Sequence, residues 1–527
     1  MAPLDWQQPY RANRSPVCAD NVVATSQPLA TEAGLDALAR GGNAVDAALA
    51  AAITLTVVEP VNTGVGSDAF CILWDGARLT GLNASGRSPA AWRPERFAGR
   101  DVMPRLGWDS VTVPGAVSAW MALSECYGVL DFAALFDRAI HYAEAGFPVG
   151  PKTAYYWRHT AARYDGFAEF ERHFLPAPAP GTRFRRPELA ATLRLLARTR
   201  GEAFYRGELA QRMAAAAAQE GGALSADDLA AHTADWVAPV AQRYRDVVLH
   251  EIPPNGQGLA AQIALGILRH LDAPPLDSAE GVHLQIEAMK LGIRAAFDHI
   301  SDAAALRTPP QALLDPTMLA RLAGRIGHRA APVPPAPLPA GADTVYLAAA
   351  DADGMMVSFI QSNFEAFGSG VVVPGTGIAL QNRGAGFSLD PEHPNCVAPR
   401  KRPFHTIIPG FVSDADDHGG APRMAFGVMG GHMQHQGHVQ MVTRVFDHGQ
   451  NPQAASDAPR WHVYPDYSVG LERDFTDEVA TALAARGHRV RREPFEHVFG
   501  GAQLVLRTAD GYVAGSDHRK EGHAGGF

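Results

Sequence analysis

An acidic residue followed by a threonine, Asp343-Thr344, stands about two-thirds of the way along the chain, directly before an apolar run. A threonine hydroxyl is a poor nucleophile until a base removes its proton, and a free α-amine on the same residue, with a pKa of about 8, can be that base. This amine exists only after the bond between Asp343 and Thr344 is broken. The pair therefore predicts a chain that cleaves itself and then uses Thr344 in hydrolysis. The ordinary alternative is a turn ahead of a strand.

The segments on either side of this pair suit that chemistry. Upstream, residues 331–342 are rich in proline and alanine, which predicts an extended, solvated tether. Downstream, the apolar runs Val345–Ala350 and Met355–Ile360 flank an Asp-Ala-Asp-Gly turn at residues 351–354, which is the signature of a β-hairpin. The sequence thus places Thr344 at the first position of a core strand, behind a loop that can be cut.

The composition describes a globular protein with a large core. The chain has 527 residues, of which 46% are hydrophobic and 19% charged, and its formal net charge is -9. That length allows two or more average domains or one large layered domain. The balance of charge argues against a disordered protein and against nucleic-acid binding, and a small anionic substrate would need a local positive site.

Cysteine spacing and the N-terminus indicate the compartment. The four cysteines are widely spaced and form no CxxC pair, so neither a disulfide framework nor a zinc cluster is expected, and we interpret them as buried thiols. The N-terminus lacks a basic region followed by an apolar segment, and no apolar run reaches the length of a membrane span. We therefore expect a soluble cytoplasmic protein that binds no membrane.

Two helices are expected near the N-terminus. A helix-compatible stretch ends at Gly41-Gly42, and Asn43 opens an alanine-rich helix that runs to about Val57. Farther along, helical patterns dominate residues 120–330, whereas strand patterns dominate residues 344–440. This distribution is typical of a mixed α+β protein.

A series of short motifs, each weak alone, gives a specific signal when taken in order. In sequence they are Gly41-Gly42-Asn43-Ala44-Val45-Asp46-Ala47-Ala48, Val57-Val58-Glu59-Pro60, Thr112-Val113-Pro114-Gly115, Glu287-Ala288-Met289-Lys290, Phe367-Gly368-Ser369-Gly370, Pro374-Gly375-Thr376-Gly377, Lys401-Arg402-Pro403, Gly430-Gly431 and Ser516-Asp517-His518-Arg519. Over nearly its whole length the chain resembles the γ-glutamyltranspeptidases. The resemblance implies the α+β, four-layer αββα sandwich of the N-terminal nucleophile hydrolases. Residues 1–343 would form a large subunit and residues 344–527 a small subunit of one αββα unit.

The same resemblance implies roles for four site residues. Thr344 resembles the nucleophile, cleavage falls between Asp343 and Thr344, and the freed amine acts as base. Ser362 aligns with a hydroxyl residue that helps hold this amine, although it could be a structural serine in a strand. Gly430 and Gly431 resemble the pair whose backbone N–H groups form the oxyanion hole, where one donor is worth roughly 3 kcal/mol. A plain tight turn is the alternative for the two glycines.

Departures from the family motifs concern the substrate's amino group. Transpeptidases hold the α-ammonium with an aspartate in an Asn-x-x-Asp-Asp-Phe-like motif, but here the acidic positions are Ala385 and Gly386. The family's serine pair aligns with His405-Thr406. An ammonium group desolvated without an anionic partner loses affinity. The sequence therefore disfavours a γ-glutamyl substrate.

The carboxylate side of the substrate site is retained in altered form. Arg87 is displaced along the sequence from the family's carboxylate-binding arginine, and Arg383 is new at a glutamine position. Arginine suits a bidentate grip on a carboxylate, although Arg383 could equally be a surface arginine. With His405 and Thr406, these residues form the expected substrate-binding set. They favour a small amide with a carboxylate and no α-amino group, of which oxamate is the simplest, and the motif set resembles the oxamate amidohydrolase branch.

Three histidines at regular spacing, His432, His435 and His438, follow the glycine pair. They suggest a metal site, but the glycines imply a turn before any helix and no carboxylate or cysteine accompanies them. We expect neither a metal nor another cofactor. His405 or His432 could instead donate a hydrogen bond to substrate.

The sequence thus predicts a self-processing amidohydrolase that converts oxamate to oxalate and ammonia through a Thr344 ester. Its partners would be the small-molecule substrate and the two subunits of one precursor, which could pair into a dimer of heterodimers. Three alternatives stay open. One is a γ-glutamyl hydrolase or transferase acting on glutathione-like compounds, another is an acylase for larger amides, and the third is an uncut, non-catalytic family member acting as a binding protein.

Overall fold

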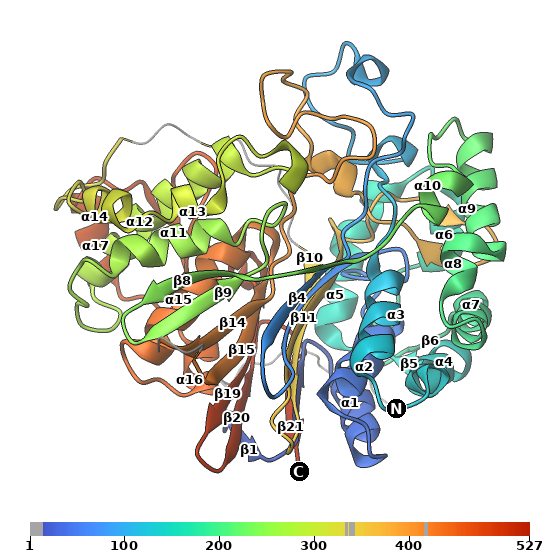
Figure 1. Ribbon diagram of the computed structural model, residues 1–527, viewed down its shortest axis with the longest axis horizontal. Helices are drawn as coiled ribbons and strands as arrows, with labels where there is room; N and C mark the ends of the chain where they lie inside the picture. The colour runs from blue at the N-terminus through green and yellow to red at the C-terminus, as the bar shows by residue number, and fades with distance from the viewer. Residues whose placement is uncertain (1–13, 333–335, 337–342, 416–419) are drawn as a thin grey trace.

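Two seven-stranded antiparallel sheets pack face to face at the centre of the molecule, and helices cover the outer face of each sheet (Figure 1). The computed structural model describes residues 14–332, 336, 343–415 and 420–527. Most of the proline-rich stretch predicted to be a tether lies outside the described residues. The four layers confirm the predicted αββα sandwich.

Each sheet draws strands from both sides of the Asp343-Thr344 pair. One sheet, called here the Thr344 sheet, has the order β21 (His523–Gly526), β2 (Val22–Thr25), β10 (Asp343–Ala350), β11 (Met356–Phe364), β3 (Asp68–Trp74), β4 (Leu79–Asn83) and β7 (Asp235–Val237). The other, called the Gly430 sheet, has the order β1 (Val17–Ala19), β20 (Gly511–Ser516), β19 (Gly501–Thr508), β15 (Pro422–Met429), β14 (Gly410–Asp414), β9 (Val247–Glu251) and β8 (Val240–Tyr244).

The helices fall into two groups, one on each outer face (Figure 1). Against the Thr344 sheet lie α1 (Pro28–Ala39), α2 (Ala44–Val58), α3 (Ala116–Tyr127), α4 (Asp137–Ala145), α5 (Pro151–Ala161), α6 (Ala168–Phe174), α7 (Pro187–Arg198), α8 (Glu202–Arg206), α9 (Glu208–Gln219) and α10 (Ala226–Ala230). On the side of the Gly430 sheet lie α11 (Leu259–Leu268), α12 (Ala279–His299), α13 (Pro310–Leu313), α14 (Pro316–Ala323), α15 (Gln434–Phe446), α16 (Pro452–Asp457) and α17 (Asp477–Ala485).

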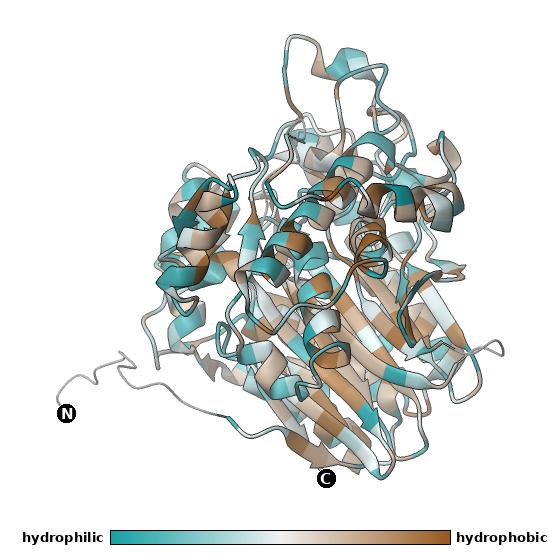
Figure 2. Ribbon diagram, turned by 90° about the vertical axis from the view of Figure 1, so that its left-hand side faces the viewer, coloured by the Kyte–Doolittle hydropathy of each residue, from teal (hydrophilic) through white to brown (hydrophobic). Residues whose placement is uncertain are grey.

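Strand β10 shows how the layers are held together. Tyr346 and Ala348 belong to the apolar cluster between the sheets, whereas Val345 and Leu347 belong to the cluster under the helices of the Thr344 sheet. Successive side chains of a strand point to opposite faces, so both faces of β10 are buried and its sequence is apolar throughout. Figure 2 shows brown, apolar residues concentrated along the strands. By the same alternation, Thr344 lies on the face directed toward the Gly430 sheet.

The predicted hairpin is confirmed. Ala350 pairs with Met356 across a turn that is closed by a hydrogen bond from Gly354 N to Asp351 O (3.0 Å). Near the other end of the hairpin the register shifts, because Asp343 faces Phe364 whereas Val345 faces Gln361. The additional residue lies on β11, so a β-bulge stands opposite Thr344.

The two helices expected near the N-terminus are also confirmed. The Asn43 side chain accepts hydrogen bonds from the N–H groups of Val45 and Asp46, and Asp46 accepts one in return from the N–H of Asn43. This reciprocal capping box starts α2, which is buried along its whole length. Its alanine-rich surface packs closely on α1 and on β10.

The expectation of four buried thiols is wrong. All four cysteines are free, but Cys18 and Cys126 are exposed and only Cys71 is fully buried. Positions at a sheet edge and at a helix end expose the first two, which composition alone does not reveal. Among the described residues, no helix has the length and hydrophobicity needed to cross a membrane.

Candidate active site

Thr344 lies buried at the start of β10, between the two sheets. Its hydroxyl donates a hydrogen bond to Ser362 Oγ (3.3 Å) and accepts one from Gln434 Nε2 (3.3 Å). In this uncut chain the nitrogen of Thr344 still belongs to the peptide bond with Asp343. The hydroxyl is therefore already placed between two polar side chains before any cleavage.

Ser362 lies in the bulged part of β11. Its Oγ also accepts the N–H of Phe364 (2.8 Å), and Phe364 has a φ of 83°, a left-handed conformation that bulky residues rarely adopt. This local distortion brings Ser362 beside Thr344. The structure thus places the two residues together as predicted, although the role of Ser362 toward the freed amine stays a prediction.

The glycine pair forms the turn between β15 and α15. Gly430 has a φ of 123°, and a Cβ there would lie 2.9 Å from Gly500 Cα, so only glycine fits. Gln434, which contacts Thr344, is the first residue of α15 and follows this turn after a short 3₁₀ segment. The pair therefore precedes the electropositive N-terminal end of the helix whose first residue contacts the nucleophile. Such a position suits the predicted oxyanion hole.

Arg383 is the most informative residue of the substrate-binding set. Its guanidinium is fully buried and donates from Nη1 to Thr406 Oγ1 (2.8 Å). Its Nε and Nη2 are also buried, but they have no hydrogen-bond partner among the described residues. Burial lowers the pKa of Arg383 to about 9, while the negative charges of Asp68 and Glu365 favour its charged form. Two nitrogens of a buried cation, without hydrogen-bond partners among the described residues, are suited to an anionic ligand.

His405 is held entirely by protein groups. Its Nε2 bonds to Asp68 Oδ2 (3.2 Å), and its Nδ1 accepts the N–H of Ile407 (3.4 Å). Burial, assisted by the charges of Arg383 and Arg402, lowers the pKa of His405 well below its usual range, so the ring is neutral with its proton on Nε2. Both ring nitrogens are engaged, so its predicted contact with substrate requires one of these bonds to break.

Asp68 is a site residue that the sequence did not reveal. It is fully buried in β3, in register with Ser362, and its Oδ1 accepts the N–H groups of Gly86 (3.2 Å) and Gly115 (2.9 Å). Burial raises its pKa to about 6, against the opposing charge of Arg383. The only signal was an aspartate directly after a glycine-bearing loop.

Arg87 lies apart from this cluster. Its side chain is 41% exposed and pairs with Asp302 (2.9 Å) and Asp235 (3.7 Å). The neighbouring Gly86 donates its backbone N–H to Asp68, whereas the side chain of Arg87 has other partners. Its predicted grip on a carboxylate would require these ion pairs to open, whereas Arg383 has free donors.

The three histidines after the glycine pair point to separate partners. His432 Nδ1 bonds to Gln257 Oε1 (3.1 Å), His438 Nδ1 bonds to Glu251 Oε1 (2.6 Å), and neither nitrogen of the buried His435 has a hydrogen-bond partner in the part of the chain that the structure describes. They do not converge on one point as metal ligands must.

One cluster elsewhere has metal-ligand character, formed by His283, Glu287 and His488. However, Lys290 Nζ lies 2.5 Å from Glu287 Oε1 and neutralises the one carboxylate. His283 Nδ1 and His488 Nε2 are 2.8 Å apart, which is a hydrogen-bond distance. A divalent cation would add uncompensated charge to this buried cluster, so we interpret it as structural.

A cavity of about 590 Å³ lies beside the segment that carries Arg383. Ala385 and Gly386, at the family's acidic positions, form one wall, and apolar side chains including Phe387, Leu389 and Phe404 line much of the rest. The Phe404 ring also approaches that of His432, with 6.1 Å between centroids. The loss of the aspartates thus coincides with an apolar space next to the site.

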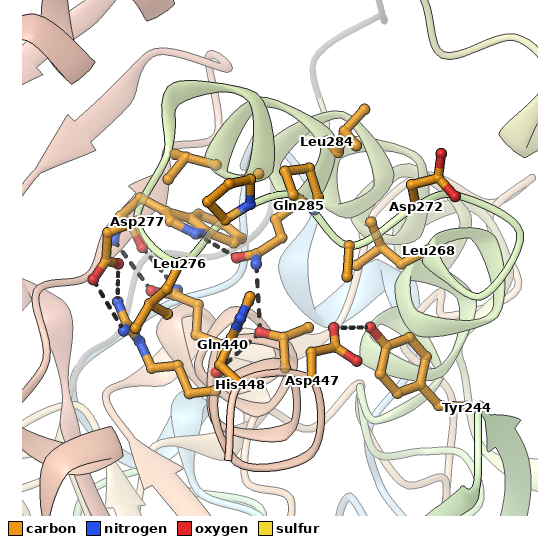
Figure 3. A pocket seen from close by; sticks show the side chains of 18 of the residues that line it. Tyr244, Leu268, Asp272, Leu276, Asp277, Leu284, Gln285, Gln440, Asp447 and His448 are labelled. Carbon is orange, nitrogen blue, oxygen red and sulfur yellow. Dashed lines mark hydrogen bonds and ion pairs between the residues drawn. The ribbon is translucent and has the colours of Figure 1, made fainter. Parts of the chain in front are cut away.

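A second cavity, drawn in Figure 3, lies near the C-terminal end of α15. Asp447 there accepts hydrogen bonds from Tyr244 Oη (2.5 Å) and Arg245 Nε (2.7 Å), and Gln285 Nε2 donates to Thr443 Oγ1 (3.4 Å). These polar groups are satisfied by one another. The cavity shares no lining residue with the Thr344 cluster.

The chain resembles known proteins along nearly its whole length. A family model described as gamma-glutamyltranspeptidase matches residues 30–527. The chain is 37% identical to the "Glutathione hydrolase-like YwrD proenzyme" of Bacillus subtilis, covering 98% of this chain and 100% of that protein. It is 36% identical to the "Oxamate amidohydrolase proenzyme" of Klebsiella pneumoniae, covering 95% and 97% respectively. Among solved structures, cephalosporin acylase from Bacillus halodurans superposes with a TM-score of 0.95 at 44% identity, covering 100% of this chain and 99% of that one.

Proposed function

The chain belongs to the gamma-glutamyltranspeptidase family, and on that premise we propose that it cleaves itself between Asp343 and Thr344 and then hydrolyses a small amide that bears a carboxylate. Residues 1–343 and 344–527 would become the large and small subunits. The best candidate substrate is oxamate, which would yield oxalate and ammonia. The buried guanidinium of Arg383, with two unpaired nitrogens, is the observation that carries this proposal.

Self-cleavage begins with the hydroxyl of Thr344. Its Oγ attacks the carbonyl carbon of Asp343, the C–N bond breaks, and the nitrogen of Thr344 takes up the proton that Oγ loses. Water then hydrolyses the resulting ester, which leaves a carboxylate on Asp343 and a free α-amine on Thr344. Gly430 and Gly431 stabilise the oxyanion of each tetrahedral intermediate.

Turnover repeats this chemistry on the substrate. The α-amine of Thr344 takes the hydroxyl proton while Oγ attacks the amide carbon, and it passes the proton to the leaving ammonia. Water then adds to the ester carbonyl, the bond between carbon and Oγ breaks, and Oγ regains a proton. Arg383 holds the substrate carboxylate beside the reacting carbonyl.

The local balance of charge favours an anionic substrate. Arg105 and Arg163 both pair with Glu365, so with Arg383 three arginines share the two carboxylates of Glu365 and Asp68. The oxygens of Asp68 are already bonded to Gly86, Gly115 and His405. The site therefore has an excess of positive charge, while its acids are engaged with protein groups. An α-ammonium would find poor compensation there.

The apolar cavity beside Ala385 and Gly386 favours a second candidate, an acylase for larger amides. A substrate with its carboxylate at Arg383 could extend an apolar group into this space. The comparison with cephalosporin acylase is in accord with such a substrate. The two candidates share the nucleophile and differ in the group that the cavity receives.

One assay separates these possibilities. Purified, processed protein is given oxamate, a γ-glutamyl anilide or an aromatic N-acyl amide, with Thr344→Ala as the blank. Saturable ammonia release from oxamate alone supports the small-amide proposal, and turnover of the aromatic amide alone supports the acylase. Turnover of the γ-glutamyl compound would mean that another group holds the ammonium. An intact chain without any turnover would favour the binding protein.

A further inference from the structure

Gln434 contacts the nucleophile but belongs to none of the motifs that identify the site. It is fully buried at the first position of α15, and its Nε2 lies 3.3 Å from Thr344 Oγ1. Ser362 contacts the same oxygen through its hydroxyl (3.3 Å). Gln434 is therefore in direct contact with the atom that forms and breaks bonds.

The orientation of the Gln434 amide is fixed by its second partner. Its Oε1 accepts the backbone N–H of Ile408 (3.0 Å), and a backbone N–H can only donate. The NH₂ group must therefore face Thr344. Because Gln434 donates to Oγ1, the hydroxyl proton is left to point toward Ser362 Oγ.

We propose that Gln434 is a catalytic residue that stabilises negative charge on Thr344 Oγ1. This inference rests on the proposed function and adds a donor distinct from the oxyanion hole, which serves the carbonyl oxygen. Oγ1 carries negative charge when it loses its proton during attack and again when the ester's C–O bond breaks. A fixed N–H donor lowers the energy of both steps without reorganising. The later step should depend on it most, because Oγ1 then departs as an alkoxide-like leaving group.

Two substitutions separate this role from structural support. Gln434→Glu keeps an oxygen for the N–H of Ile408 but replaces the donor facing Thr344 with a carboxylate oxygen. Gln434→Met removes both hydrogen bonds at similar volume. The matched control is Gln440→Met on the same helix, labelled in Figure 3. Gln440 is also buried. Its Nε2 donates to the carbonyl of Trp461 (3.1 Å) and its Oε1 accepts the N–H of Trp461 (3.2 Å), but it lies away from Thr344.

The experiment follows self-cleavage of the full chain by gel electrophoresis and then turnover by intact mass spectrometry of the small fragment. Both Gln434 variants should cleave about 100-fold or more slowly, which is the range for loss of one preorganised donor. During turnover the Gln434 variants should accumulate the ester on Thr344. Gln440→Met should cleave and turn over substrate at rates within about twofold of wild type. Melting temperatures identify any variant that is merely unfolded.

Two results would overturn the inference alone. One is wild-type cleavage and turnover in a folded Gln434→Met, and the other is equal slowing in Gln440→Met. If Gln434→Glu, which retains the Ile408 contact, were as active as wild type, the donor would likewise be unnecessary. A wild-type chain that neither cleaves nor turns over any amide would instead contradict the proposed function, and the inference would fall with it.

Discussion

The guanidinium of Arg383 stacks over the ring of Phe364, with 4.7 Å between Cζ and the ring centroid. Phe364 in turn donates its backbone N–H to Ser362, which accepts the hydroxyl of Thr344. Phe364 thus connects Arg383, the candidate carboxylate-binding residue, to the nucleophile Thr344. The short path between them fits a substrate whose carboxylate lies close to its scissile amide.

The role of Thr344 predicts an all-or-none result. Thr344→Ala should remain a single chain of 56.1 kDa and show no amide turnover, because the variant lacks the attacking oxygen. Thr344→Ser should still cleave, since it keeps both a hydroxyl and, after cleavage, an α-amine. Gel electrophoresis with N-terminal sequencing checks both. A fragment that begins at any residue other than 344 would place the nucleophile elsewhere.

Arg383 should control binding of the carboxylate. Arg383→Met removes charge-assisted hydrogen bonds worth about 3 kcal/mol, so kcat/KM for oxamate should fall roughly 100-fold. Arg383→Lys should recover only part of this loss, because an ammonium lacks the planar fork. Steady-state kinetics with oxamate and with its uncharged diamide analogue measure the effect. Arg87→Met tests the competing assignment, and a larger loss there would favour Arg87.

Asp68 should make stability depend on pH. Because burial raises its pKa from about 3.8 to about 6, the native state holds a proton that the unfolded chain has lost within this window. The free energy of unfolding should therefore fall as pH rises from 4 to 6, by about 2 kcal/mol relative to Asp68→Asn, and level off above pH 7. Urea denaturation of both proteins at several pH values tests this. If the stability of wild type relative to Asp68→Asn instead increased with pH, the charge of Arg383 and the hydrogen bonds to Asp68 would outweigh the effect of burial on its pKa.

The apolar cavity should decide between small and large amides. Leu389→Trp would fill part of it, so KM for an aromatic N-acyl amide should rise about tenfold or more, a change of about 1.4 kcal/mol. Oxamate does not need this space, and its kcat/KM should change less than about twofold. Parallel kinetics on the two substrates check the prediction. Equal losses on both would mean that the substitution disturbs the neighbouring Arg383 segment instead.

Much of the fold could be predicted because its signals are local. Alternating apolar residues around an Asp-Ala-Asp-Gly turn specified the hairpin of β10 and β11, and Asn43 specified the start of α2. The layer arrangement came from the resemblance to a family and was confirmed. Exposure of Cys18 and Cys126 was mispredicted because it depends on which edge of the fold each residue occupies.

Site residues that belong to sequence motifs could be predicted. Residues whose role depends only on their tertiary contacts could not. Thr344 and Ser362 are in contact, and the glycine pair comes shortly before Gln434, which also contacts Thr344. Gln434 and Asp68 carry no sequence signal, since a buried glutamine or aspartate becomes informative only when its partners are known. The direction of a side chain is equally hidden, and it separates the buried Arg383 from the half-exposed Arg87.

Both sheets contain strands from either side of Thr344. Under the proposed cleavage, β2 stays hydrogen-bonded to β10, and β3 to β11, so the products remain interlocked. The contact of Thr344 with Gln434, which follows β15 of the Gly430 sheet, forms only once the two sheets have packed together. Cleavage would therefore report that the chain has folded correctly. Uncut chains in a wild-type preparation would then mark molecules in which the two sheets have not packed together.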